Sequence, residues 1–306
     1  MIDVQDLVYE YPSQRALHGI TLAIPAGSIT ALVGPNGAGK TTLMRLLAAL
    51  EMPFSGTVRI AGIDTRADPR AVHRAIGYLQ DFYGLYDDLT VRQCLLYAAR
   101  ARGFDAPAAD AAVRETAALV GLDGRLDQPA GELSRGYRQR LGIGQAIVHA
   151  PRLLLLDEPA AGLDPEAREA LSRLFLALRE RGMSLLVSSH ILAELEDYSD
   201  EMVIIDGGRL IGRRAVRGQA GQATRIVVAL AASRPGLGAA LRELTGRDPV
   251  AADADGATVV VEGDAAARAA LLAGLIAQGF PVASFAAAAT SMQDHYLASV
   301  RERRGG

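Results

Sequence analysis

The feature that most constrains this chain is an apolar run that leads directly into a glycine-rich segment and then into a helical pattern. Residues 28–33 read SITALV, residues 34–42 read GPNGAGKTT, and residues 43–50 continue as LMRLLAAL. A buried strand, a loop of small residues and a helix, in this order, are typical of an open α/β sheet. Such sheets hold their ligands at the carboxyl ends of the strands. The segment therefore predicts both the fold class and the place of a ligand site.

The glycine-rich segment has the spacing G-x-x-x-x-G-K-[ST] of a phosphate-binding loop. Successive backbone N–H groups from Gly37 to Thr42, at the start of a helix, favour the negative charge of phosphates. Lys40 is expected to reach the β- and γ-phosphates of a nucleotide, and the Thr41 hydroxyl to ligate Mg²⁺. The predicted nucleotide-binding residues are Gly34, Pro35, Asn36, Gly37, Ala38, Gly39, Lys40, Thr41 and Thr42.

Two further apolar runs, RLLLLDEP and SLLVSSH, predict parallel strands that are buried on both faces. Asp157 follows the first run, where its carboxylate could hold the Mg²⁺ shell. Glu158 is next in the chain and could orient or deprotonate an attacking water. The alternative is that both acidic residues simply end a strand, as turn residues do.

Single polar residues follow two predicted strands in the same way. Gln80 follows AIGYL and His190 follows SLLVSS, so both are expected at the edge of the sheet that carries Asp157. Gln80 could touch the metal or the water, and His190 could donate to the γ-phosphate. For each residue alone, the alternative is an ordinary loop or turn position.

The remaining pattern divides the chain into two domains, at residues 1–220 and 221–306. Within the first, residues of about 83–150 are mostly helical by apolar spacing, with breaks at GFDAP and GLDGRLDQPAGE. Asp164 is predicted to cap a following helix that stops at Gly182. After the linker at residues 217–223, strands and helices alternate as in a small α+β domain of βαββαβ type, closed by an amphipathic helix at 291–304.

Composition excludes several classes of protein. The chain has 32 basic and 35 acidic residues, a net charge of −3, so nothing in its bulk charge points to nucleic acid. A single cysteine forms no disulfide within the chain. No signal peptide is apparent, and no apolar run approaches the ~18 residues needed to span a bilayer.

A second helix start suited to anions lies far downstream of the first. Residues 133–141 read LSRGYRQRL, with a serine at an N-cap position, a glycine two residues later and a helix rich in arginine and glutamine. The alternative interpretation is an ordinary capped helix.

Taken together, these motifs resemble the ATPases of the ATP-binding cassette (ABC) transporters over nearly all of residues 1–220. GPNGAGKT, Gln80, LSRGYRQR, LLLLDEP, GLD and His190 occur in the family's order. The resemblance implies a P-loop NTPase core with an antiparallel β subdomain and a helical subdomain. It also implies that Tyr11 stacks on adenine, although Tyr9 is a nearby competitor, and that Asp164 belongs to a loop that couples two sites.

The resemblance explains the second helix start, because LSRGYRQRL is similar to the family's signature, commonly LSGGQ. Ser134 and the amide of Gly136 would bind the γ-phosphate of an ATP held by the phosphate loop of another subunit. Two ATP molecules would then lie between two cassettes, in a homodimer or a heterodimer. This chain has Arg135 and Tyr137 where the common form has glycine and glutamine.

The resemblance further implies a partner, a separate transmembrane permease, which would hold this ATPase on the cytoplasmic face of the membrane. The groove that receives the permease would lie around residues 83–100, and the alternative for this stretch is simply a packed helical subdomain. The tail resembles that of type-2 exporter ATPases, with Met292 in place of the usual leucine. The rival interpretation is a soluble ABC ATPase that acts on a nucleoprotein or protein complex. One cassette, no heptad run and one cysteine favour the transporter, and no direct nucleic-acid contact is expected.

Overall fold

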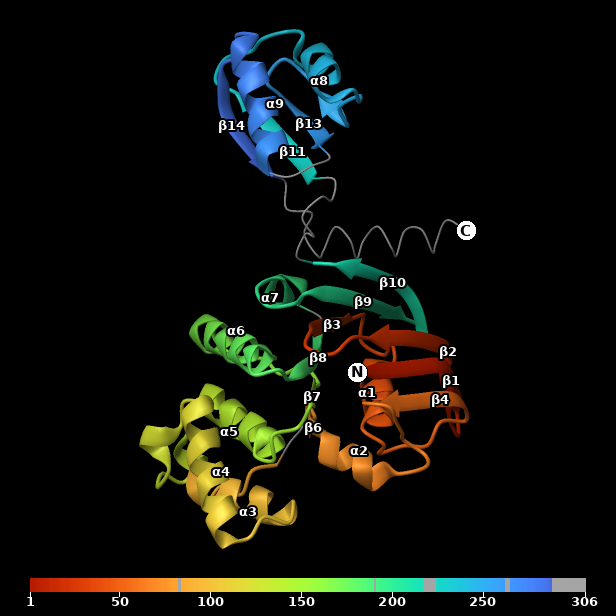
Figure 1. Ribbon diagram of the computed structural model, residues 1–306, viewed down its shortest axis with the longest axis vertical. Coiled ribbons are helices and arrows are strands. Elements are labelled where there is room, and N and C mark those ends of the chain that lie inside the picture. The colour runs from red at the N-terminus through yellow and green to blue at the C-terminus, as the bar shows by residue number, and fades with distance from the viewer. Residues whose placement is uncertain (82–83, 190, 217–223, 262–264, 288–306) are drawn as a thin grey trace. The chain divides into compact units, whose positions relative to one another are not determined.

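The computed structural model describes residues 1–81, 84–189, 191–216, 224–261 and 265–287. The chain divides into two compact units, one formed by residues 1–216 and the other lying beyond residue 216 (Figure 1). The predicted linker and its boundary at residues 220–221 lie outside the described residues, as does the predicted helix at 291–304.

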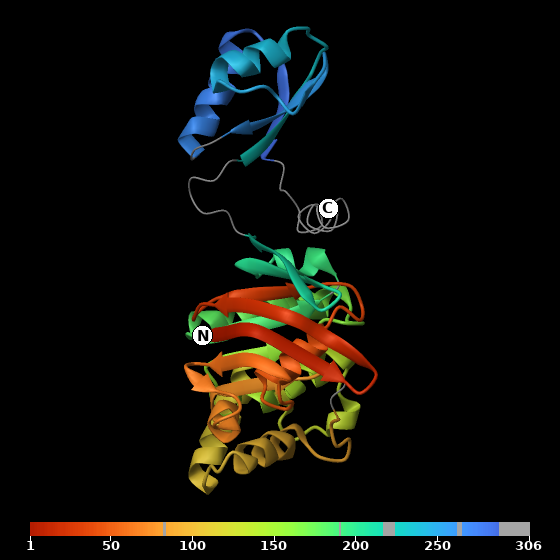
Figure 2. The same cartoon turned by 90° about the vertical axis from the view of Figure 1, so that its right-hand side faces the viewer.

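The first unit begins with an antiparallel sheet of strand order β2-β1-β4-β5. Its strands are β1 (Ile2–Tyr11), β2 (Gln14–Ile24), β4 (Ser55–Ile60) and β5 (Ile63–Asp64). Burial alternates along β2 and β4, which is the pattern of strands with one face on the core and one face in water. Figure 2 shows these strands, coloured red to orange, side by side.

The second sheet of this unit has the strand order β10-β9-β3-β8-β7-β6. Strands β3 (Ile29–Val33), β7 (Leu153–Leu156) and β8 (Ser184–Ser189) are buried at every residue. They run parallel to one another and to β6 (Ile76–Leu79) and β9 (Glu201–Asp206). The predicted parallel strands, covered on both faces, are therefore confirmed.

Helix α1 (Lys40–Leu47) joins the two sheets into one core. Its side chains Leu43, Met44 and Leu47 belong to a buried cluster that also contains Ile2 and Val58 of the antiparallel sheet, and Leu155 and Leu186 of the parallel sheet. The start of α1 is fixed by this packing, and the phosphate loop directly precedes it.

A helical region follows β6 along the chain, as predicted. It contains α3 (Val91–Ala101), α4 (Ala106–Leu119) and α5 (Arg135–Ile147), which Figure 1 shows grouped at one end of the first unit. Thr90 starts α3 with a reciprocal capping box to Gln93. Asp105 caps α4 through Ala108 N. The two predicted breaks fall between these helices, the second of them containing η1 (Asp123–Arg125) and η2 (Ala130–Glu132).

Helix α6 (Pro165–Glu180) lies between β7 and β8 in the chain. The Asp164 carboxylate accepts a hydrogen bond from Ala167 N at 2.8 Å, which confirms the predicted N-cap. Gly182 follows the helix at φ 87°, in agreement with the predicted stop. A short helix, α7 (Leu192–Glu196), follows β8.

Several elements were not anticipated from the sequence, and three of them lie in or beside the first unit's sheets. They are α2 (Pro69–Ala75), which Asp68 caps, and the hairpin of β9 with β10 (Arg209–Ala215). Strand β9 adds to the parallel sheet beside β3, and β10 closes that edge antiparallel. The turn between them is Gly207–Gly208, and it lies close to the phosphate loop because Gly208 N donates to Ala38 O.

The second unit is the predicted small α+β domain. Its elements are β11 (Thr224–Leu230), α8 (Leu237–Thr245), β12 (Ala251–Ala252), β13 (Gly256–Val261), α9 (Ala265–Ala277) and β14 (Val282–Ala287). The strands form one antiparallel sheet of order β12-β13-β11-β14. This is the arrangement of a βαββαβ unit with a split βαβ crossover. Strand β12, only two residues long, has no clear signal in the sequence.

Candidate functional site

The phosphate-binding loop lies between the end of β3 and the start of α1. Gly39, the residue before α1, has φ 102°, and a Cβ added there would come within 2.8 Å of Leu17 Cδ2. Only glycine fits this conformation and this space. The N-terminus of α1 therefore faces the cavity next to the loop, together with its first N–H groups and Thr41.

Lys40 is the first residue of α1, and its side chain is only 7 % exposed. Its Nζ donates to Gly34 O at 2.8 Å and to Pro35 O at 3.4 Å. It also lies 3.5 Å from Glu158 Oε1. The loop thus holds the ammonium group in a fixed position next to a carboxylate that the sequence analysis assigned to catalysis.

The acidic pair follows the carboxyl end of β7. Asp157 is buried, and its Oδ1 accepts a hydrogen bond from Ser188 Oγ at 2.6 Å. The Ser188 hydroxyl in turn accepts from Glu158 N at 2.9 Å. Glu158 has φ 50°, a left-handed conformation that costs a non-glycine residue about 1–3 kcal/mol and occurs often at functional sites. The arrangement turns the Glu158 side chain out of the strand direction and toward Lys40.

Ser188 was not singled out from the sequence. The available signal was a pair of serines at the end of the otherwise apolar SLLVSS, inside a strand that is buried at every residue. A buried hydroxyl needs a partner, and here the partners are the two residues of the acidic pair.

The residues present fit a Mg²⁺ ion. Asp157 Oδ2 is buried and has no hydrogen-bond partner among the described residues, so one carboxylate oxygen remains available as a ligand. Gln80 directly follows β6, whose last residue Leu79 pairs with Leu156 at the end of β7. Gln80 and Asp157 therefore leave neighbouring strands at the same level. The Thr41 hydroxyl is on the first turn of α1 and is exposed.

A cavity of about 630 Å³ adjoins the loop. It is lined by Tyr11, Gln14, Arg15, Ala16, His18, Asn36, Gly37, Ala38, Gly39, Lys40, Thr41, Thr42, Asp81, Glu158, Gly207 and Gly208. Most of the predicted phosphate-binding residues are thus brought together with Tyr11 and Glu158. Gln80 is exposed and does not line the cavity, whereas its neighbour Asp81 does. His190 lies outside the described residues.

Of the two tyrosines considered for an aromatic contact, Tyr11 is the one at the cavity. Its hydroxyl lies 3.3 Å from Thr42 Oγ1. Tyr9 instead donates its hydroxyl to Glu51 Oε2 at 3.0 Å and meets the Tyr11 ring edge-on, with ring centroids 5.0 Å apart. The geometry therefore favours Tyr11 as the residue that faces a ligand.

The β9–β10 turn is a part of the site that the sequence analysis missed. Gly208 has φ 69°, and a Cβ added there would come within 2.2 Å of Ala16 O. Its carbonyl accepts from His18 N, and its own N–H donates to Ala38 O. The Asp-Gly-Gly sequence at 206–208 is a turn signal, but only the fold shows that this turn borders the cavity.

The second helix start lies away from this cavity. Ser134 is the N-cap of α5 and is exposed, and its hydroxyl makes no capping bond to its own helix in the part of the chain described. Gly136 packs so tightly against the start of α6 that an added Cβ would lie 2.9 Å from Ala167 Cβ. Neither residue, nor Asp164, lines the cavity at the phosphate loop. The two helix starts that were predicted to suit anions are therefore separate in one chain.

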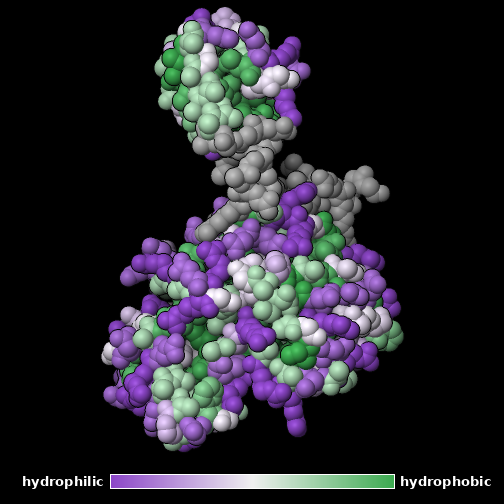
Figure 3. Space-filling model, in the orientation of Figure 1, coloured by the Kyte–Doolittle hydropathy of each residue, from purple (hydrophilic) through white to green (hydrophobic). Residues whose placement is uncertain are grey.

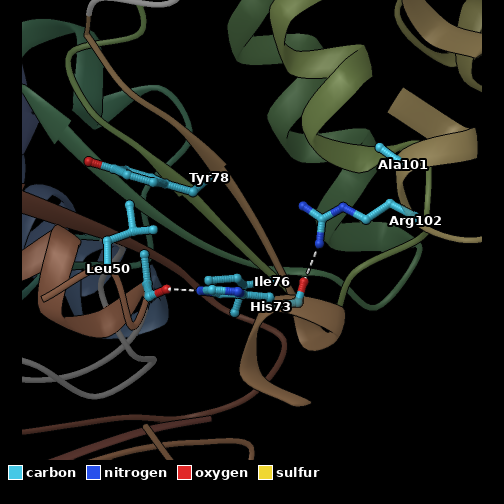
Figure 4. A pocket seen from close by; sticks show the side chains of 7 residues that line it. Leu50, His73, Ile76, Tyr78, Ala101 and Arg102 are labelled. Carbon is cyan, nitrogen blue, oxygen red and sulfur yellow. Dashed lines mark hydrogen bonds between the residues drawn. The ribbon is translucent and has the colours of Figure 1, made fainter. Parts of the chain in front are cut away.

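Another hollow, of about 360 Å³, lies between α2, β6 and the end of α3. Figure 4 shows His73 and Arg102 linked there, with an Arg102 N–H donating to His73 O and His73 Nε2 donating to Ala48 O. Tyr78 lines the same hollow, and burial together with the negative charge of Asp157 raises the pKa of Tyr78 to about 12. Its phenol therefore stays neutral to a higher pH than that of a free tyrosine.

The surface around the first unit is mixed in character. Figure 3 shows hydrophilic residues interrupted by small hydrophobic groups. The large exposed apolar side chains of the first unit include Leu50, Met52, Phe54, Tyr86 and Tyr97. Among the described residues, no helix is long and apolar enough to cross a membrane.

Comparison with known proteins agrees with this geometry. The model of the ABC transporter family matches residues 17–161. The Nod factor export ATP-binding protein I of Burkholderia lata is 35 % identical over 214 residues, which is 70 % of this chain and 70 % of that protein. The bacitracin transport ATP-binding protein BcrA of Bacillus licheniformis is 37 % identical over 69 % of this chain and 68 % of its own length. The solved structure of an ATP-binding subunit of an ABC transporter, 32 % identical, covers 70 % of this chain and 90 % of its own, with a TM-score of 0.63.

Proposed function

Because this chain belongs to the ABC transporter family, we propose that it is the ATP-binding and ATP-hydrolysing subunit of an ABC exporter. The observation that carries the proposal is the cluster of Lys40, Asp157 and Glu158 at one edge of the parallel sheet. Lys40 Nζ lies 3.5 Å from Glu158, and Ser188 joins Asp157 to the backbone of Glu158. This cluster lies beside a cavity with a glycine-rich helix start and an aromatic ring at Tyr11.

The residues divide the work of hydrolysis as follows. Tyr11 contacts the base, and the N–H groups from Gly37 to Thr42 bind the phosphate oxygens. Lys40 neutralises charge on the β- and γ-phosphates. Glu158 orients a water for attack on the γ-phosphorus and accepts its proton, while the bond from the phosphorus to the ADP oxygen breaks.

Thr41, Gln80 and Asp157 would hold Mg²⁺. When bound, the ion neutralises developing charge on the phosphate oxygens. Ser188 donates to one Asp157 oxygen, so the other would be available as a ligand. His190, which follows β8, is proposed to donate to the γ-phosphate.

Each active site is proposed to be shared between two copies of the cassette, in a homodimer or with a related subunit. The exposed Ser134 and the amide of Gly136, at the start of α5, supply the second half of the site from the other copy. Their separation from the cavity of the same chain supports this arrangement. ATP then acts as the bridge that closes the dimer, and hydrolysis opens it again.

Closure is proposed to drive a separate transmembrane permease, with this subunit held on the cytoplasmic face of the membrane. The hollow lined by His73, Tyr78 and Arg102 (Figure 4) is the proposed contact, together with the exposed Leu50 and Phe54, 46 % and 66 % exposed. Exposed apolar side chains that group on a surface often mark a protein–protein contact. The proposed contact thus lies at the end of α3, next to the stretch 83–100 that was expected to hold the groove.

The direction of transport is proposed from the relatives, whose names describe the export of a Nod factor and the transport of bacitracin. The second unit and the sequence of the tail, which resembles that of type-2 exporter ATPases, support the same direction. The rival is a soluble ABC ATPase acting on a nucleoprotein or protein complex. It would use the same cluster, and its partners would distinguish it.

The proposal is tested with Glu158→Gln. This variant keeps the shape of the side chain but loses the base, so ATP binding is expected to stay within about threefold while hydrolysis falls by at least about 100-fold. Glu180→Gln, at an exposed position on α6, is the matched control and is expected to keep wild-type turnover. Unchanged hydrolysis in Glu158→Gln would place the base elsewhere.

The partner is tested with the same variant, tagged and recovered from its native membranes with ATP and Mg²⁺. A multi-spanning membrane protein at two cassettes per complex is the expected result. Recovery of ribosomes, nucleic acid or soluble proteins alone would support the rival class instead.

A further inference from the structure

The residue that distinguishes the start of α5 is Arg135. Its Nη2 donates to Ala161 O at 2.8 Å. Its guanidinium also lies against Gly162, where an added Cβ would come within 2.5 Å of Arg135 Cζ. The side chain therefore reaches back across the surface of its own chain, from the first turn of α5 to the segment after Glu158.

That segment, residues 158–164, is short and internally hydrogen-bonded. Ala161 N donates to Glu158 O at 3.1 Å, and Leu163 N donates to Ala160 O at 3.2 Å. The segment ends at Asp164, the cap of α6. A displacement of Ala161 would therefore also move Glu158 at one end of the segment and the start of α6 at the other, because hydrogen bonds connect them.

We propose that Arg135 is a positioning residue that joins the signature segment, Ser134–Gly136, to the segment 158–164, and so couples the two ATP sites of the dimer. The inference rests on the proposed function, since Ser134 serves the ATP of the other copy while Glu158 serves the ATP of its own chain. With Arg135 in place, the two segments move together. The close contact of Gly136 with Ala167 is a second link, between the signature segment and α6.

The guanidinium suits this role for a geometric reason. It is planar, so it lies flat on Gly162 while one N–H donates to Ala161 O. Gly162 has φ 67° and no Cβ, which leaves the space that the plane occupies. A lysine could reach the carbonyl, but it has no plane to pack on the glycine. Arg135 is exposed, so its effect is expected on coupling rather than on folding stability.

The test compares steady-state hydrolysis in Arg135→Ala, Arg135→Lys, Gly162→Ala and the double variant Arg135→Ala/Gly162→Ala. Removing the link is expected to lower kcat about tenfold, within the usual range of coupling effects. KM for ATP is expected to stay within about twofold, because the cavity at the phosphate loop is untouched. Gly162→Ala displaces the guanidinium and is expected to give the same fall. The double variant is then expected to be no slower than either single variant, since the two residues form one contact.

Two controls separate coupling from other effects. Gly182→Ala has a similar positive φ, 87°, but no neighbour within 4 Å of the added Cβ, so it reports the backbone strain alone and is expected to keep kcat. Arg135→Lys keeps one donor and is expected to recover part of the loss. Thermal unfolding of every variant shows that each is folded.

Each outcome is decisive. Two results would overturn the link: a fall in kcat in the double variant equal to the product of the two single falls, or a fall in Arg135→Ala with none in Gly162→Ala. Either would assign Arg135 a direct contact with phosphate across the dimer. An equal loss in Gly182→Ala would attribute the effect of Gly162→Ala to strain. A wild-type chain without Mg²⁺-dependent ATP hydrolysis would instead contradict the proposed function, which is a distinct result.

Discussion

Lys40 is the only lysine of a chain with 32 basic residues, and its place explains why arginine does not serve there. The ammonium group is buried between two loop carbonyls and the carboxylate of Glu158. A compact point charge fits this space, whereas the flat fork of a guanidinium needs more room.

The substitution Lys40→Ala is therefore expected to weaken ATP binding by at least about tenfold, because it removes the charge that faces the β- and γ-phosphates. Lys40→Arg keeps the charge but not the fit, and it is expected to bind ATP more weakly than the wild type as well. Equilibrium titration with a fluorescent ATP analogue measures both. If the affinity of Lys40→Ala matched that of the wild type, the assignment of Lys40 would be wrong.

At the residue scale the sequence predicts the parts of the site that lie within one motif. A strand end followed directly by glycines or acidic residues predicts the phosphate loop, Asp157 and Glu158. No such contiguous motif predicts Ser188 and Gly208, because they reach the site only through the neighbouring strands β8 and β9. The choice between Tyr11 and Tyr9 likewise depends on which ring faces the cavity.

Helix α5 shows how one element accommodates its departures from the family pattern. Tyr137, in place of the usual glutamine, contacts two guanidinium groups through its ring, with Arg125 4.2 Å and Arg140 4.6 Å from the ring centroid. Cation–π contacts of this kind contribute about 0.5–1 kcal/mol each at exposed sites. Both unusual residues of the signature, Arg135 and Tyr137, thus bind to other parts of the same chain.

The far end of α5 is joined to β6 by His149. Its Nε2 donates to Ile76 O at 2.9 Å, while its Nδ1 is buried with no hydrogen-bond partner among the described residues. Protonation would place a charged donor at Nδ1 where nothing accepts it. Burial, together with the nearby Arg102, lowers the pKa of His149 from 6.5 to about 4.

The pH dependence follows from the sign of this shift. Between the two pKa values the unfolded chain binds more protons than the folded one, so the free energy of unfolding falls as the pH drops from about 6.5 to about 4. The contribution of this one group is on the order of 2–3 kcal/mol at the acid end. Urea unfolding of wild type and His149→Gln at several pH values measures it. A wild-type curve parallel to that of the variant would show that His149 does not carry this effect.

Elements with a clear amphipathic or fully apolar pattern are predictable, and those defined by their neighbours are less so. The strands β3, β7 and β8 and the helix α6 follow directly from the sequence. The β9–β10 hairpin carries a turn signal at Gly207–Gly208, but its place beside β3 is defined by pairing between distant segments of the chain. The two-residue β12 exists through its pairing with β13 alone.

At the scale of the whole molecule, the described residues that line the cavity at the phosphate loop lie between 11 and 208, in the first unit. The second unit has a separate core that includes Ile226, Leu241, Val259, Leu275 and Phe280. The cavity at the phosphate loop and the core of the second unit are therefore formed by different parts of the chain.

The proposed sharing of each active site between two copies of the cassette is tested at the scale of the whole molecule. Ser134→Arg places a bulky cation at the exposed helix start that would meet the other copy's ATP. Both proteins carry Glu158→Gln, so that ATP is not hydrolysed. With ATP and Mg²⁺, the Glu158→Gln protein is expected to sediment as a dimer, and the double variant Glu158→Gln/Ser134→Arg as a monomer. Nucleotide affinity of the monomer is expected to stay within about threefold, because Ser134 does not line the cavity of its own chain. An ATP-dependent dimer that forms equally well with Arg at position 134 would contradict the shared site, and the phosphate loop and the signature segment would then belong to independent sites.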